Sequence, residues 1–182
     1  MGNQVIVVYK SSTGFTKKYA QIIADELNCA TADNKLAEAN RLSAYPIVVF
    51  GSRAHAGRID GFKKIRELYG KRRIKNLILF VTGAMPDTAK EEIAQFWKQN
   101  LTDRELRDIP HFYMPGGLCY EKMSVTDKWM MKAAAVMLKK KKDKTDADRA
   151  FEQAITGSYD ISSEMYAQPL IDYVKAQMRE HR

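Results

Sequence analysis

Near the start of the chain, four hydroxyl side chains surround one glycine, a group of residues suited to binding an anion. They directly follow the apolar run 5–9, and apolar residues at helical spacing begin directly after them. The first backbone N–H groups of a helix have no partner within the helix, and the helix dipole favours an anion there. A glycine lets a phosphate approach the backbone, and hydroxyl groups add further donors. The pattern predicts a strand, a phosphate-binding loop and a helix, with a loop made of Ser11, Ser12, Thr13, Gly14 and Thr16.

This loop differs from two other phosphate-binding patterns. It lacks the Gly-Lys-Ser/Thr of a Walker loop, and it is not Gly-x-Gly-x-x-Gly, so direct reduction by NAD(P)H is not predicted. It resembles the Ser/Thr-x-Thr-Gly-x-Thr fingerprint of the flavodoxin family, matched by Ser11, Thr13, Gly14 and Thr16. In that family the loop holds the terminal phosphate of FMN, so the resemblance implies FMN as the cofactor. A hydroxyl-rich turn that only caps a helix is the alternative interpretation.

Three further loops follow later strands of the chain, at 52–57, 82–86 and 115–120. In an open α/β sheet, ligands bind beyond the carboxyl ends of the strands. Residues 50–57 look like the Gly-x-Ser-(Ile)-Arg-x-Gly segment of the protoporphyrinogen dehydrogenase branch of the flavodoxin-like proteins. The segment from Gly116 to Tyr120, followed by Trp-Met-Met-Lys, is also similar to that branch.

The resemblance implies a set of cofactor-binding residues in the four loops. The first loop would hold the FMN phosphate, the second would line one side of the isoalloxazine ring, and the third would offer backbone groups to its pyrimidine edge. Gly57 is the candidate for a small residue that lets the backbone turn toward the flavin N5. The only aromatic ring in the second and third loops is the imidazole of His55, which favours a site open to a substrate. The implied set is Ser11, Ser12, Thr13, Gly14, Phe15, Thr16, Ser52, Arg53, Ala54, His55, Ala56, Gly57, Thr82, Gly83, Ala84, Gly116 and Gly117.

The sequence assigns no catalytic residue. His55 is a candidate proton donor and is equally well interpreted as an exposed loop histidine, because a proton donor must reach its substrate. Arg53 and Arg58 could attract an acidic substrate or the flavin phosphate, or could be solvated. Tyr120 could close over the flavin or pack, and Cys119 could be a redox thiol, although no second cysteine lies nearby in the sequence.

Apolar strands that alternate with amphipathic helices are expected to hold these loops in place. Strands are expected at 5–9, 29–32, 45–52, 74–81 and 111–114. A loop is expected over 53–61, and Asp87 or Thr88 is expected to cap the helix that ends near Leu101. The alternation predicts right-handed crossovers and a parallel sheet covered on both faces. Five strands fit the flavodoxin-like order 2-1-3-4-5, so the resemblance implies an α/β fold class, a flavodoxin-like doubly wound three-layer sandwich with a five-stranded parallel sheet.

A long segment after the fifth strand exceeds what a minimal sheet of this kind needs. Residues 118–163 are expected to form a helical insertion within a single domain, 1–182, before a last helix at 164–178. Residues 127–142 carry an apolar stripe and end in four lysines. Such a stripe usually faces a core, so a packing helix with a solvated tail is the favoured interpretation. The alternatives are peripheral contact with an anionic membrane through 127–144, or a cover over the flavin.

Composition narrows the class of protein and its partners. The 182 residues are 45% hydrophobic, which suits one domain with a sizeable core. The net charge of +8 favours anionic partners and departs from the acidic electron-carrier flavodoxins; no nucleic-acid motif accompanies it, so nucleic acid is not expected. The two cysteines indicate neither a disulfide framework nor a metal site, and no metal is expected. With neither a signal peptide nor a long apolar run, the sequence predicts a cytoplasmic protein, or one peripheral at the inner face of the membrane.

Three functions remain open. The leading expectation is an FMN-binding oxidoreductase that passes electrons between a small organic substrate, of porphyrinogen or quinone type by resemblance, and an acceptor. The second is a flavodoxin-type carrier that meets a redox partner protein, and the third is a flavin-free interaction module on the same fold. The insertion and the positive charge favour the enzyme, whereas the lack of a recognisable acid–base pair favours the carrier. The intact loop 11–16 argues against the third.

Overall fold

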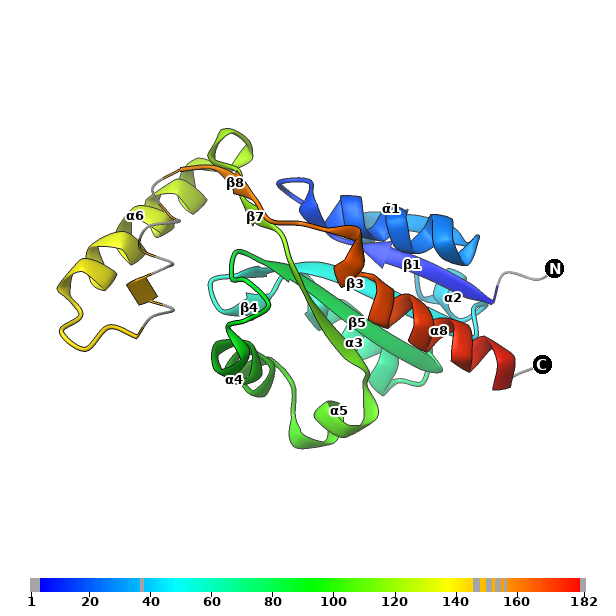
Figure 1. The fold of residues 1–182 in the computed structure, drawn as a ribbon. Coiled ribbons are helices and arrows are strands. Elements are labelled where there is room, and N and C mark those ends of the chain that lie inside the picture. Colours follow the sequence, from blue (N-terminus) through cyan, green and yellow to red (C-terminus); the bar gives the residue numbers. More distant parts are fainter. Residues whose placement is uncertain are drawn as a thin grey trace.

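A parallel sheet with helices on both faces forms the centre of the chain (Figure 1). The computed structural model describes residues 4–36, 38–145, 148, 149, 152, 155 and 157–180. Its five parallel strands have the expected order 2-1-3-4-5 when they are counted along the chain. In sheet order they are β2 (Ala30–Asp33), β1 (Val5–Tyr9), β3 (Ile47–His55), β5 (Asn76–Gly83) and β6 (His111–Pro115).

The central strands are apolar throughout because both faces of the sheet are covered. Val5 and Val7 of β1 belong to one apolar layer, and Ile6 and Val8 belong to the other. Each of these side chains is almost wholly inaccessible to solvent. The alternation of side chains along a strand therefore places the sheet between two separate cores.

Different helices complete the two cores. On one face lie α1 (Phe15–Leu27) and α8 (Gln168–Glu180), and on the other lie α2 (Ala39–Leu42), α3 (Phe62–Gly70) and α4 (Lys90–Asn100). The expected cap of α4 is wrong, because its N-cap is Ala89, whose side chain cannot accept a hydrogen bond. A short helix absent from the sequence prediction, α5 (Asp103–Asp108), follows α4 and begins with a capping box between Thr102 and Glu105. Single turns of 3₁₀ helix occur at η1 (Asn34–Leu36), η2 (Tyr120–Lys122) and η3 (Glu164–Tyr166).

The expected loop over 53–61 is largely a hairpin. β3 continues to His55 and pairs in antiparallel fashion with β4 (Arg58–Ile59). Between them, Ala56 has φ 48° and Gly57 has φ 74°, and positive φ at both central residues is the requirement of the tight hairpin turn. The sequence prediction ended this strand at Ser52 because alanine at the first turn position gives no signal for such a turn.

The insertion begins and ends with two short strands that pair with each other. β7 (Gly117–Leu118) pairs with β8 (Tyr159–Asp160), so the insertion leaves and rejoins the sandwich at adjacent points. Between them, α6 (Val125–Lys140) stands away from the sheet in Figure 1. The expectation of a packing helix is wrong for its outer face: Trp129 is 69% exposed, Met137 is also exposed, and neither core contains an α6 residue. Within the described residues, no helix combines the length and the apolar character needed to cross a bilayer.

Candidate functional site

The loop between β1 and α1 leaves the first turn of α1 open to an anion. Gly14 is the N-cap of α1, and no side chain in the described part of the chain caps that turn. The Gly14 amide itself donates to Ser11 Oγ at 3.2 Å, which fixes the loop. Gly14 has φ 106°, a conformation that residues with a Cβ rarely adopt. The arrangement fits a phosphate, because the N–H groups of the first helical turn have no partner within the helix.

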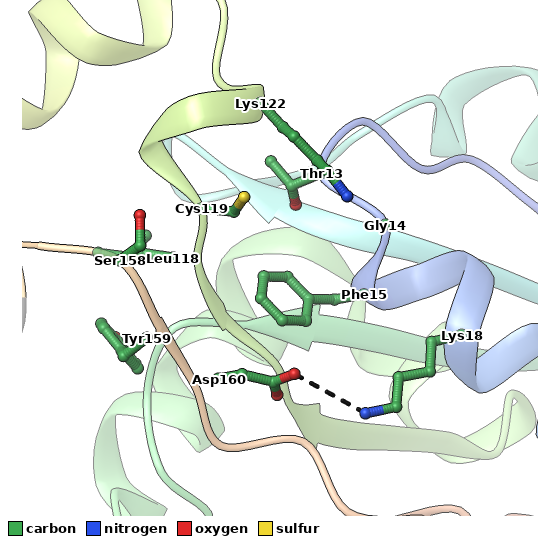
Figure 2. A pocket seen from close by; sticks show the side chains of 10 residues that line it. All are labelled: Thr13, Gly14, Phe15, Lys18, Leu118, Cys119, Lys122, Ser158, Tyr159 and Asp160. Atoms are coloured by element: carbon green, nitrogen blue, oxygen red, sulfur yellow. Dashed lines mark ion pairs between the residues drawn. The ribbon is translucent and has the colours of Figure 1, made fainter.

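A pocket of about 490 Å³ lies against this loop (Figure 2). Thr13, Gly14, Phe15 and Lys18 line one side of it. The opposite side belongs to the insertion and consists of Leu118, Cys119, Lys122, Ser158, Tyr159 and Asp160. Its volume is in the range of pockets that hold small ligands and cofactors.

Two lysines add positive charge to the pocket. Lys122 reaches from η2 toward the loop in Figure 2, and its Nζ lies 3.9 Å from the point that a Cβ at Gly14 would occupy. Lys18 Nζ donates to Ser162 Oγ at 2.8 Å and lies 3.8 Å from Asp160 Oδ2. A side chain at position 14 would extend toward the ammonium group of Lys122, so the absence of a side chain there leaves room for an anion.

Thr16 differs from the other hydroxyl residues of the loop. Its side chain is buried, and its Oγ1 lies 2.8 Å from Thr82 Oγ1 at the end of β5. The pair therefore joins the first and third loops, and the Thr16 hydroxyl is directed at a protein partner. Ser12 is exposed, and Ser11 and Thr13 are half-buried.

The second loop is held by a chain of charged groups. Ser52 is fully buried, and its hydroxyl donates to the carbonyl of Asp60. Arg53 Nε donates to Asp60 Oδ2 at 3.3 Å, and Lys10 Nζ donates to Asp60 Oδ1 at 2.6 Å. On its other side, Arg53 Nη1 donates to Asp127 Oδ2 at 3.0 Å, while His55 Nε2 lies 2.8 Å from Asp127 Oδ1.

Both carboxylates of this chain are stabilised in their charged form. Burial raises the pKa of Asp60, but the hydrogen bond and charge of Lys10, followed by those of Arg53, together hold that pKa below its ordinary value. Burial also raises the pKa of Asp127, and hydrogen bonds from His55 and Arg53 likewise bring it below its ordinary value. Because a carboxylate can only accept, the hydrogen shared with Asp127 lies on His55 Nε2.

The backbone acceptors of the third loop already have partners in the chain. The Gly83 carbonyl accepts from the Gly116 amide at 2.8 Å, and the Ala84 carbonyl accepts from the Tyr159 hydroxyl at 2.7 Å. Gly117 has φ 141°, and a Cβ there would lie 2.1 Å from the Tyr159 carbonyl oxygen. Of the two glycines expected at the cofactor, Gly116 therefore bonds to the third loop, and Gly117 lets the two short strands of the insertion approach each other.

The structure thus brings the four predicted loops to one edge of the sheet but engages many of their polar groups internally. Sequence reasoning missed several residues of this region, namely Lys10, Lys18, Asp60, Lys122, Asp127, Tyr159 and Asp160. Lys18 had a local signal, since it lies in the first turn of α1. The others reach the site through pairings across the fold, and local sequence gives no such signal.

These features define an α/β protein with an uncapped helix N-terminus and a pocket at the carboxyl edge of a parallel sheet. A flavodoxin domain model matches residues 6–146, more than two thirds of the sequence. The chain belongs to the flavodoxin domain family. Membership of this family supports a function as a flavin-binding redox protein. No curated protein is significantly similar to the chain in sequence.

Solved structures with similar folds include a flavodoxin, WrbA-like protein from Agrobacterium tumefaciens, with 21% identity and a TM-score of 0.39 over 68% of this chain and 86% of the other. Megasphaera elsdenii flavodoxin has 18% identity and a TM-score of 0.44 over 60% and 82%. The rubredoxin oxygen:oxidoreductase of Desulfovibrio gigas has 17% identity and a TM-score of 0.45 over 97% and 37%. The family assignment depends on the sequence match and not on these similarities.

Proposed function

We propose that this chain binds FMN and is an oxidoreductase that passes electrons between a small organic substrate, of porphyrinogen or quinone type, and a second acceptor. When bound, the flavin supplies the redox chemistry itself. The residues of the chain would bind its phosphate, orient it and limit the access of water.

The observation that carries the proposal is the uncapped first turn of α1, which contains Lys18 and faces Lys122 across one pocket. A phosphomonoester there would meet backbone N–H groups and the Thr13 hydroxyl, and Lys122 would balance its charge, together with Lys18, which also lies 3.8 Å from Asp160. Such charge-assisted contacts are each worth about 1.5–3 kcal/mol. FMN should therefore bind far more tightly than riboflavin, which has no phosphate.

The insertion favours an enzyme over a carrier. A carrier exchanging electrons with proteins needs an open flavin edge, whereas here the insertion supplies the far wall of the pocket through Leu118, Cys119 and Lys122. A wall of this kind suits a pocket for a small molecule. An electron carrier remains the second candidate. Among the described residues, no acid–base pair lacks structural hydrogen-bond partners, so none is marked as catalytic.

The outer face of α6 supports a further part of the proposal, peripheral contact with an anionic membrane through 127–144. Val125, Trp129, Val136 and Met137 are exposed together on this helix. Lysines flank them, and Lys132 Nζ lies 5.5 Å from the centre of the Trp129 ring. Exposed apolar side chains with lysines beside them match the interface of an anionic bilayer.

Binding of FMN and of riboflavin, followed by flavin fluorescence, tests the proposal. The wild type should prefer FMN by at least tenfold, and Lys122→Ala should reduce that preference about tenfold, which corresponds to about 1.4 kcal/mol. Lys75→Ala removes the same charge at the opposite edge of the sheet and should leave the preference unchanged. A protein that binds neither flavin would exclude the redox function, and equal affinity for both would exclude the phosphate site.

A further inference from the structure

The insertion helix α6 has an unusual pattern of burial. Its one buried residue is Asp127, in the first turn, whereas large apolar side chains of the same helix are exposed. Among the described residues, Asp127 is also the one charged side chain that is buried. Burying a carboxylate is costly unless it is paired, so its position calls for a specific set of partners.

Those partners all lie on β3. Asp127 receives one hydrogen bond from Arg53 on Oδ2 and one from His55 on Oδ1, so each oxygen has its own donor. Ser124 caps the same turn by accepting from the Asp127 amide at 3.1 Å. Both ends of the aspartate, backbone and side chain, are therefore fixed.

The hydrogen bonds of Asp127 belong to a network that extends beyond α6 and β3. Arg53 also bonds to Asp60, and Asp60 bonds to Lys10 directly after β1. One chain of charges thus runs from the end of β1, across the end of β3, to the first turn of the insertion helix. Within the described residues, the hydrogen bonds that join α6 to the sandwich are those of Asp127.

We propose that Asp127 is a positioning residue that docks the insertion on the carboxyl end of β3 and fixes the orientation of the His55 ring there. The negative charge also suits its place in the first turn of α6, where the helix dipole is positive. With Nε2 held by Asp127, Nδ1 is the ring nitrogen left for a partner in the site. The consequence for flavin rests on the proposed function: a docked insertion would cover residues 52–57 and slow the release of FMN.

The docking itself can be measured without flavin, by pulsed dipolar spectroscopy. Spin labels at Ala133→Cys on α6 and Lys98→Cys on α4, in a Cys29→Ser and Cys119→Ser background, report the distance between insertion and sandwich. We expect one narrow distance distribution, and a broad one after Asp127→Ala. Alanine is the best helix former, so α6 should still form, although the change also removes the interaction of the carboxylate with the helix dipole. Asp143→Ala removes an exposed carboxylate beyond the end of α6 and should leave the distribution narrow.

The tautomer of the His55 ring gives a second measurement. The ¹⁵N shifts of the ring should show hydrogen on Nε2 in the wild type and a mixture of tautomers in Asp127→Ala. A narrow distance distribution in Asp127→Ala, with an unchanged ring spectrum, would overturn the proposal.

FMN release separates this inference from the function on which it rests. The release rate should rise about tenfold in Asp127→Ala and not in Asp143→Ala. A wild type that binds no FMN would defeat the flavin function, yet the distance and tautomer measurements would still decide the role of Asp127. Normal FMN binding with unchanged distances would defeat the docking alone.

Discussion

The hydroxyl oxygens of Thr16 and Thr82 lie 2.8 Å apart in the buried interior, although 66 residues separate them in the sequence. The pair fastens the first turn of α1 to the end of β5, and so fixes the distance between two of the loops at the candidate site. Thr82 Oγ1 also lies 3.4 Å from the Ser52 carbonyl, which gives it a second acceptor. Thr16 has no other partner in the described residues.

This asymmetry predicts unequal costs for two similar substitutions. Thr82→Val leaves the Thr16 hydroxyl buried without a partner and should lower the free energy of unfolding by about 1–3 kcal/mol. Thr16→Val should cost less, because Thr82 can still donate to Ser52. Urea unfolding of both single variants and the double variant measures the difference, and the double variant should lose less than the sum. Equal, additive losses would contradict the pairing.

Since the Thr16 hydroxyl is directed inward, Thr16→Val should also retain the preference for FMN over riboflavin.

The pH dependence of stability should reflect Asp60 and Asp127. Both have pKa values lowered in the folded state, so the unfolded chain binds more protons in acid, and stability rises with pH in that range. Their contribution is present above the unfolded pKa of about 3.9 and is lost as the pH falls through the folded value. Asp60→Asn should therefore be less stable than the wild type at pH 7, with the difference shrinking below pH 4. Urea unfolding between pH 7 and pH 3 measures this, and a constant difference would speak against the ion pairs.

The two cysteines should react at different rates with a thiol reagent. Burial, with the nearby charge of Asp25, raises the pKa of Cys29 to about 11, so little of its thiolate is present at pH 8. Cys119 lines the pocket beside the phosphate loop. Iodoacetamide at pH 8 should modify Cys119 at least tenfold faster, as mass spectrometry of peptides can show, and FMN should slow that reaction. Faster modification of Cys29, or no protection by FMN, would disagree with the arrangement of the pocket.

The two tryptophans provide an internal probe of membrane contact. Trp129 on α6 is 69% exposed, whereas Trp97 on α4 is 6% exposed within the core. Vesicles containing anionic lipid should shift the fluorescence of Trp129 to shorter wavelength, and Trp129→Phe should abolish the shift. Each lysine near the surface contributes about 1 kcal/mol, so Lys139→Gln should weaken binding about fivefold. Equal binding to neutral vesicles, or an absent shift, would count against membrane contact.

The sheet could be predicted because its signals are local. Buried strands are read as short apolar runs such as Val5–Tyr9, and the helices between them show apolar residues at helical spacing. The position of the loop between β1 and α1 was equally visible, since Gly14 and its hydroxyl neighbours lie together in the sequence; its binding of an anion stays a prediction. The strand order came from the resemblance to the flavodoxin-like fold.

The missed features depend on contacts across the fold. The burial of Thr16 results from its pairing with Thr82, and the engagement of Arg53 and His55 results from an aspartate 72 residues from His55. The apolar stripe of α6 has the same periodicity as a core-facing helix, so the sequence could not reveal that its outer face would stay exposed. Periodicity reports that a helix has an apolar face and not what that face meets.

The hairpin of β7 and β8 makes the insertion a separable module. Leu118 pairs with Tyr159, so backbone pairing already joins the two ends of the insertion before α6 begins. A two-residue turn joining these strands could replace residues 119–158 while leaving the register of the main sheet unchanged. Such a shortened chain would keep the loop at Gly14 and both cores, because no described residue between 119 and 158 belongs to either core.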